Sequence, residues 1–175
     1  MLRSRKVACR IVTTCFPMLV LAITSVSGQP LPQGAPVVAV DNPESLFVDD
    51  DPVVHLNKQT TLHILREIFQ CNQWERADEW LTERYIQHNP NAASGQEALQ
   101  RVFARGTERT ENCGELRSGI VAVLGDDDKV AVIYRAVYRD PRNADDTYTS
   151  TYVDMWRFVD GKADEHWDSA RLNTQ

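Results

Sequence analysis

The order in which two residue patterns occur along the chain constrains its fold more than any other feature. Apolar residues recur at helical spacing between about residues 60 and 106, whereas runs rich in Val, Ile and Tyr begin at residue 116. Helices that precede a set of strands favour an α+β fold. We therefore predict three N-terminal helices packed on a strongly curved antiparallel sheet, with a cone-shaped pocket enclosed between them.

The individual elements follow from apolar spacing and from end signals. Thr60 or Thr61 can cap the first helix, and Ser94 with Glu97 forms a capping box before the third. An Asp-Gly pair at 160–161 predicts a tight turn between the last two strands. The predicted helices cover residues 60–72, 73–82 and 94–106, and the predicted strands cover 116–124, 130–139, 148–159 and 162–170.

The first 28 residues have the pattern of a secretory signal peptide. Four basic residues precede an apolar stretch from Ile11 to Val26, and small residues follow it. The stretch falls short of the roughly 20 apolar residues that a membrane span needs, although a membrane anchor and a mitochondrial presequence remain alternatives. We expect a secreted or periplasmic protein from which residues 1–28 are removed.

The remainder divides into a predicted flexible leader, rich in Pro and acidic residues, at 29–57 and a single folded domain at 58–175. Residues 1–28 hold four of the 19 basic residues and none of the 25 acidic ones, so the rest of the chain has a formal charge of −10. Such a charge argues against nucleic acid and anionic membrane surfaces as partners. Cys71 and Cys113 could form a disulfide in an oxidising compartment, or they could be two separate buried thiols.

The last predicted strand places ionisable groups beside a large aromatic side chain. Alternation puts His166 and Asp168 on one face of this strand and Trp167 on the other. Burial disfavours the charged form of a carboxylate, which is one way to obtain a general base that works near neutral pH. Asp168 is therefore a candidate base if it faces a cavity, and a structural carboxylate if it does not.

Two segments resemble a known family. One reads YIQHNP at residues 85–90 and is followed by GQEA at 95–98, and the other reads RFVDGKADEHWD at 157–168. Together they resemble the SnoaL-like proteins, a polyketide cyclase-like family of the nuclear transport factor 2-like superfamily. The resemblance extends over about residues 58–170. It implies the cone-shaped fold of that superfamily and a homodimer formed through the sheet.

The resemblance also implies aldol-type ring closure or isomerisation of a small apolar carbonyl compound, without metal or organic cofactor. The cyclases use an aspartate at the end of the last strand as general acid/base, which corresponds to Asp168, and an Asn that corresponds to Asn89. The chain departs from them at Asp154, where they have a His, and at Tyr152, where they have a Gln. Because a second carboxylate would repel Asp168, enolisation or hydrolysis is an alternative to cyclisation.

The candidate catalytic residues are Asp168, His88 and Asp154. The candidate substrate-binding residues are Asn89, Tyr152, Trp156, His166 and Tyr85. His88 could polarise a carbonyl or pair with one of the two aspartates, and it could equally tie its loop to the sheet. A metal site is conceivable by ligand type from His88, Asp154, His166 and Asp168. Since no short-spaced ligand motif supports such a site, we expect no metal and no cofactor.

Two functions remain open at this point. The first is an exported enzyme that performs acid/base chemistry on a carbonyl compound, and the second is a non-catalytic small-molecule-binding or dimerisation module. The environment of Asp154 and Asp168 distinguishes them. A pair held away from solvent favours catalysis, whereas solvated carboxylates in salt bridges favour the module.

Overall fold

Helices occupy the first half of the folded chain and strands the second, with one exception. The computed structural model describes residues 34–104 and 108–173. The helical elements are the 3-10 helix η1 (Pro43–Leu46), the α-helix α1 (Pro52–His63), the π-helical segment η2 (Ile64–Gln70), the 3-10 helix η3 (Trp74–Arg76) and the α-helices α2 (Ala77–Trp80) and α3 (Gln96–Phe103). The strands are β1 (Leu81–Gln87), β2 (Ile120–Asp126), β3 (Lys129–Asp140), β4 (Asn143–Val159) and β5 (Lys162–Asp168).

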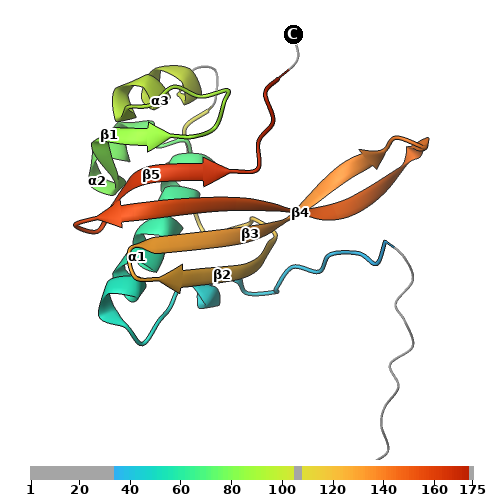
Figure 1. Cartoon of the computed structure of the whole chain (residues 1–175), viewed down its shortest axis with the longest axis horizontal. Coiled ribbons are helices and arrows are strands. Elements are labelled where there is room, and N and C mark those ends of the chain that lie inside the picture. The colour runs from blue at the N-terminus through green and yellow to red at the C-terminus, as the bar shows by residue number, and fades with distance from the viewer. Residues whose placement is uncertain (1–33, 105–107, 174–175) are drawn as a thin grey trace, which may run out of the picture. The chain divides into compact units, whose positions relative to one another are not determined.

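The five strands form one sheet in the order β1-β5-β4-β3-β2. Helix α1 packs against β2, β3 and β5, and Figure 1 shows it behind the sheet. Gly125 on β2 permits this close approach, because a Cβ atom there would lie 2.4 Å from Cγ1 of Val54 on α1. The predicted α+β class is confirmed. The prediction of a wholly antiparallel sheet is wrong for one pair, since β1 runs parallel to β5.

The first helix begins earlier than predicted. The Asp51 side chain caps α1 by accepting hydrogen bonds from the backbone N–H groups of Val53 (2.8 Å) and Val54 (3.1 Å). Phe47, which falls within the predicted flexible leader, is fully buried in the core. The acidic end of the leader is therefore a helix cap, and the folded part starts before residue 58. The predicted signal peptide lies outside the described residues.

The predicted second helix at 73–82 is less regular than expected, and its last two residues belong to a strand. The 3-10 helix η3 and the α-helix α2 follow one another over residues 74–80, and the chain then enters β1 at Leu81. The predicted capping box at Ser94 is wrong as well, because Gly95 precedes α3 without a side-chain cap, and the Ser94 hydroxyl instead accepts a hydrogen bond from the backbone of Gln87 (3.0 Å). Both differences bring the YIQHNP segment onto the edge of the sheet beside β5.

The hairpin of β3 and β4 is longer than its neighbours. Its pairing continues to Asp140 opposite Asn143, so most of the predicted polar loop at 140–146 belongs to β4. Figure 1 shows the far half of this hairpin projecting beyond β2 and β5. The near half carries Trp156 and Phe158, which are buried in the core as alternation predicts. No helix in the described ranges is long and apolar enough to span a membrane.

Candidate functional site

A cavity of about 300 Å³ lies between the inner face of the sheet and the helical elements. Its apolar wall comes largely from η2, Trp74 and α3, and its polar end comes from the strands and from the segment that follows β1. The apolar lining residues are Ile64, Leu65, Ile68, Phe69, Trp74, Leu81, Ala92, Leu99 and Phe103. The other lining residues are Tyr85, Gln87, Asn89, Ser118, Tyr134, Tyr152, Asp154, His166 and Asp168.

Strand register brings the polar side chains together. Asp154 on β4 stands directly opposite Asp168 on β5, and Tyr152 stands opposite Tyr134 on β3. Residues two apart on a strand share a face, so His166 joins Asp168 on the cavity side. One carboxylate oxygen each of Asp154 and Asp168 and one ring nitrogen of His166 lie within 4.8 Å of one another. The predicted shared face of His166 and Asp168 therefore becomes one wall of a cavity.

His166 is held between two oxygen atoms. Its Nδ1 lies 2.8 Å from Oε1 of Gln87, and its Nε2 lies 3.2 Å from Oδ1 of Asp154. A neutral imidazole can donate to only one of these oxygens, whereas the imidazolium donates to both. The ring is 5% exposed, so its orientation is fixed by packing as well as by these contacts.

The Asp168 carboxylate is held by neutral donors. Oδ2 accepts a hydrogen bond from Nδ2 of Asn89 (2.5 Å), and Oδ1 accepts one from the backbone of Ala170 (2.9 Å). The amide oxygen of Asn89 is in turn bonded by Asn91 (2.8 Å), which fixes the direction of the amide group. Asn89 thus orients the carboxylate of Asp168, which differs from its predicted contact with substrate.

Two tyrosine hydroxyls face the same carboxylates. Burial, and then the charges of Asp154 and Asp168, raise the pKa of Tyr152 above its ordinary value. Burial, and then the charge of Asp154, likewise raise the pKa of Tyr134. The hydroxyl oxygen of Tyr134 is buried and makes no hydrogen bond within the described part of the chain. Sequence reasoning missed Tyr134, although alternation along β3 puts it on the buried face with Val130 and Val132.

Two predicted binding residues form the layer behind the polar end. Trp156 donates a hydrogen bond from Nε1 to the Tyr85 hydroxyl (3.0 Å), and both side chains are buried. The Trp156 ring packs beside the His166 ring, with centroids 4.9 Å apart. Tyr85 lines the cavity but Trp156 does not, so Trp156 supports His166 from behind.

His88, predicted as a catalytic residue, points away from the cavity. Its Nε2 lies 3.1 Å from Oε2 of Glu165, and its ring stacks on Trp167 with centroids 4.8 Å apart. The reason is register, because Gln87 pairs with His166 and faces inward, so the next residue faces outward. Its role as a tie between its loop and the sheet, which the sequence left as an alternative, is the one that the structure shows.

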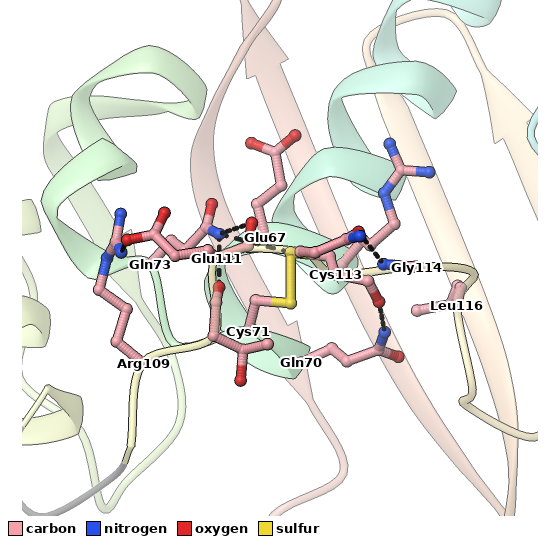
Figure 2. The surroundings of a disulfide bond; sticks show 12 residues. Glu67, Gln70, Cys71, Gln73, Arg109, Glu111, Cys113, Gly114 and Leu116 are labelled. Atoms are coloured by element: carbon pink, nitrogen blue, oxygen red, sulfur yellow. Dashed lines mark hydrogen bonds and ion pairs between the residues drawn. A yellow bond between two sulfur atoms is a disulfide. The ribbon is translucent and has the colours of Figure 1, made fainter.

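A disulfide fixes one wall of the cavity. Cys71 and Cys113 are joined, which decides between the two predicted alternatives. Figure 2 shows the bond linking the end of η2 to the loop that precedes β2, with Gln70 and Gln73 reaching across to the same loop. The amide of Gln70 donates to the backbone oxygen of Cys113 (2.9 Å), and that of Gln73 donates to the backbone oxygen of Thr110 (2.7 Å). The bond therefore anchors the helical segment that supplies much of the apolar lining.

The chain is similar in sequence to one protein family and in fold to several solved structures. The sequence profile of the SnoaL-like domain matches residues 65–166, more than half of the chain. Similar solved structures include a SnoaL-like polyketide cyclase candidate from Jannaschia sp. CCS1 (19% identity, TM-score 0.49, 69% of this chain and 90% of that chain covered). Two others are IdmH, a polyketide cyclase candidate from Streptomyces antibioticus (17%, 0.44, 64% and 89%), and an LEH-like epoxide hydrolase from M. tuberculosis (13%, 0.45, 65% and 80%). No curated protein matches the chain significantly.

Proposed function

The chain belongs to the SnoaL-like domain family, and from this premise we propose that its cavity binds a small apolar carbonyl compound on which Asp168 performs acid/base chemistry. The reaction would be enolisation, which leads to aldol-type cyclisation or to isomerisation. One observation carries the proposal. The Asp168 carboxylate stands at the polar end of a largely apolar cavity, and its direction is fixed by Asn89 and by the backbone of Ala170.

The proposed step moves a proton from the carbon next to the carbonyl to the Asp168 carboxylate. The electron pair of the broken C–H bond becomes the C=C bond of an enolate, and the negative charge moves to the oxygen. A hydrogen-bond donor that faces this oxygen lowers the barrier. The Tyr134 hydroxyl supports this assignment, because it is buried at the cavity and makes no hydrogen bond within the described residues.

The remaining polar residues take supporting roles in this proposal. Asn89 positions the base, since its amide group is already bonded to Asp168. His166, rather than His88, would relay the proton, because its ring lines the cavity between Gln87 and Asp154. Neither Asp154 nor Asp168 forms an ion pair with Lys or Arg in the described part, which favours catalysis over a solvated salt-bridge network.

Isotope exchange tests the proposal directly. The folded protein would be incubated in heavy water with a panel of cyclic and linear diketones and keto esters, and deuterium uptake at the acidic carbon would be followed by NMR. We expect exchange that the wild type accelerates and that Asp168→Asn abolishes. Asp160→Asn is the matched control, because Asp160 lies in the turn between β4 and β5 at a φ of 50°, which Asn tolerates.

The second function class gives a different result. If compounds of the panel bind in the cavity but none exchanges faster than in buffer, Asp168 is not a carbon-acid base. The protein would then be a small-molecule-binding module, and the apolar lining would account for affinity without chemistry.

A further inference from the structure

The polar end of the cavity carries negative charge without a basic residue to balance it. Asp154 and Asp168 both line the cavity, while no Lys or Arg does within the described residues. The ion-pair partner of Asp154 is His166, and the hydrogen bonds to Asp168 within residues 34–104 and 108–173 come from the uncharged donors Asn89 and Ala170. With a neutral His166 the three side chains carry a formal charge of −2, and with an imidazolium they carry −1.

The nearest arginines cannot supply the missing charge. Arg84 and Arg157 are both bonded to Asp164, which does not line the cavity. Arg157 also pairs with Glu165. A net negative charge on partly buried carboxylates is unfavourable unless a cation joins it. A bound ligand is therefore the natural source of that cation.

The rest of the cavity suits an organic cation. Six aromatic rings line it, those of Phe69, Trp74, Tyr85, Phe103, Tyr134 and Tyr152. Aromatic faces attract cations through their quadrupole and also bury apolar surface. In addition, the Tyr134 hydroxyl oxygen has unused acceptor capacity in the described structure, and an ammonium N–H can fill it.

We infer that the ligand of this cavity is an apolar compound that carries a protonated amine, bound with its ammonium group beside Asp154 and Tyr134. The inference rests on the proposed function, which requires a carbonyl group in the ligand. It adds that the ligand also carries a positive charge. The ammonium lies at Asp154, which leaves the Asp168 carboxylate free to take the carbon-bound proton. Compounds that bear a carboxylate or a phosphate are excluded, because the negative charges of Asp154 and Asp168 repel them.

A matched series of ligands tests the charge alone. The probes are 2-naphthylmethylamine, 2-naphthylmethanol and 2-naphthoate, which share one apolar body and differ in charge. Calorimetric titration near neutral pH should show the amine binding at least about tenfold more tightly than the alcohol, with the carboxylate weakest. Equal affinity of the amine and the alcohol, or no binding of either, would overturn the inference.

Variants assign the preference to one residue. Asp154→Asn should weaken binding of the amine about tenfold while affinity for the alcohol changes less than about threefold. Retained binding of the alcohol shows that the variant keeps its cavity, and Asp160→Asn should leave the whole series unchanged. If Asp154→Asn does not fold, the affinities of the wild type for the three probes still decide whether the cavity prefers an amine.

Two further outcomes separate this inference from its neighbours. Stoichiometric binding of Zn²⁺ or Mn²⁺ alone, lost in Asp154→Asn and in His166→Gln, together with no preference for the amine, would assign the cluster to a metal and overturn the inference. Preference for the amine without isotope exchange would contradict the proposed chemistry and leave the inference standing. Isotope exchange on neutral ketones without a preference for the amine would support the proposed chemistry and overturn the inference.

Discussion

At the scale of single residues, Tyr134 offers the most direct test of the site. Tyr134→Phe removes one oxygen atom and keeps the ring that packs in the cavity wall. We expect kcat for isotope exchange to fall about 100-fold with little change in KM, because the enolate would lose a donor. Urea unfolding should show unchanged or slightly higher stability, since the lost hydroxyl is buried and makes no hydrogen bond in the described structure. A destabilised variant with normal kcat would mean that the hydroxyl is structural.

Asp164 makes a second prediction, which concerns stability against pH. Hydrogen bonding from Arg84, supported by Thr82 and opposed by burial, lowers the pKa of Asp164 from 3.8 to about 2. A carboxylate whose pKa is lower in the folded state stabilises the protein above pH 4, and that stability is lost as the pH falls toward 2. Because Arg84 is largely exposed, we expect a contribution of only about 1–2 kcal/mol.

The variant Asp164→Asn measures this contribution. Urea unfolding near neutral pH should show the variant less stable than the wild type by about 1–2 kcal/mol, and the difference should close as the pH approaches 2. A difference that stays constant across this range would show that packing of the side chain, rather than its charge, is responsible.

The histidines show how far a sequence can place single residues. The pattern of β5 predicts that His166 shares a face with Asp168, and the structure confirms it. His88 is adjacent to Asn89 in the chain, yet only Asn89 contacts the site. The direction of His88 is set by its pairing with a strand nearly 80 residues away, which no local pattern contains.

At the scale of elements, the disulfide makes the third prediction. The bond between Cys71 and Cys113 closes a loop of sequence separation 42, for which chain entropy predicts a stabilisation of about 3–4 kcal/mol. The double variant Cys71→Ser with Cys113→Ser should lose about that much free energy of unfolding, and a reducing agent should cause the same loss in the wild type. The reducing agent should leave the double variant unchanged. A loss below about 1 kcal/mol would show that Gln70 and Gln73 suffice to hold the loop.

Secondary structure could be predicted where buried residues recur periodically along the chain. The prediction failed where pairing with a distant strand determines whether a segment is a strand. Alternation identified β3 and β5 to within two residues of their observed bounds, whereas β4 begins five residues before the predicted strand. In β1 the buried residues are Leu81 and Tyr85, four apart, and this spacing is typical of a helix. The segment is a strand because it pairs with β5 in parallel, across a separation that sequence periodicity does not report.

At the scale of the whole molecule, export is the fourth prediction. We expect that a host that recognises the predicted signal peptide removes residues 1–28 and releases a protein that begins at Gln29. The disulfide supports this proposal, because such bonds persist mainly in oxidising compartments. The mass of the intact protein from the extracellular or periplasmic fraction measures it. An uncleaved chain in the membrane fraction would indicate an anchor instead.

The fifth prediction is that the protein forms a homodimer through the outer face of the sheet. Apolar side chains of Ile133, Val153, Met155 and Trp167 share this face, and all four are partly exposed. Register makes them neighbours, since Ile133 stands opposite Val153 and Met155 stands opposite Trp167. Contiguous apolar surface of this kind marks an interaction site.

Sedimentation velocity on the wild type and on Met155→Lys tests the dimer. Placing a charge in the middle of the apolar face should convert the expected dimer to a monomer, because a buried charge without a partner is costly at an interface. The cavity lies on the other side of the sheet, so binding of the naphthyl probes should survive and report an intact fold. Asp128→Lys, a change in the turn between β2 and β3, should leave the dimer in place. A wild type that sediments as a monomer would refute the assignment and leave this apolar face to a different partner.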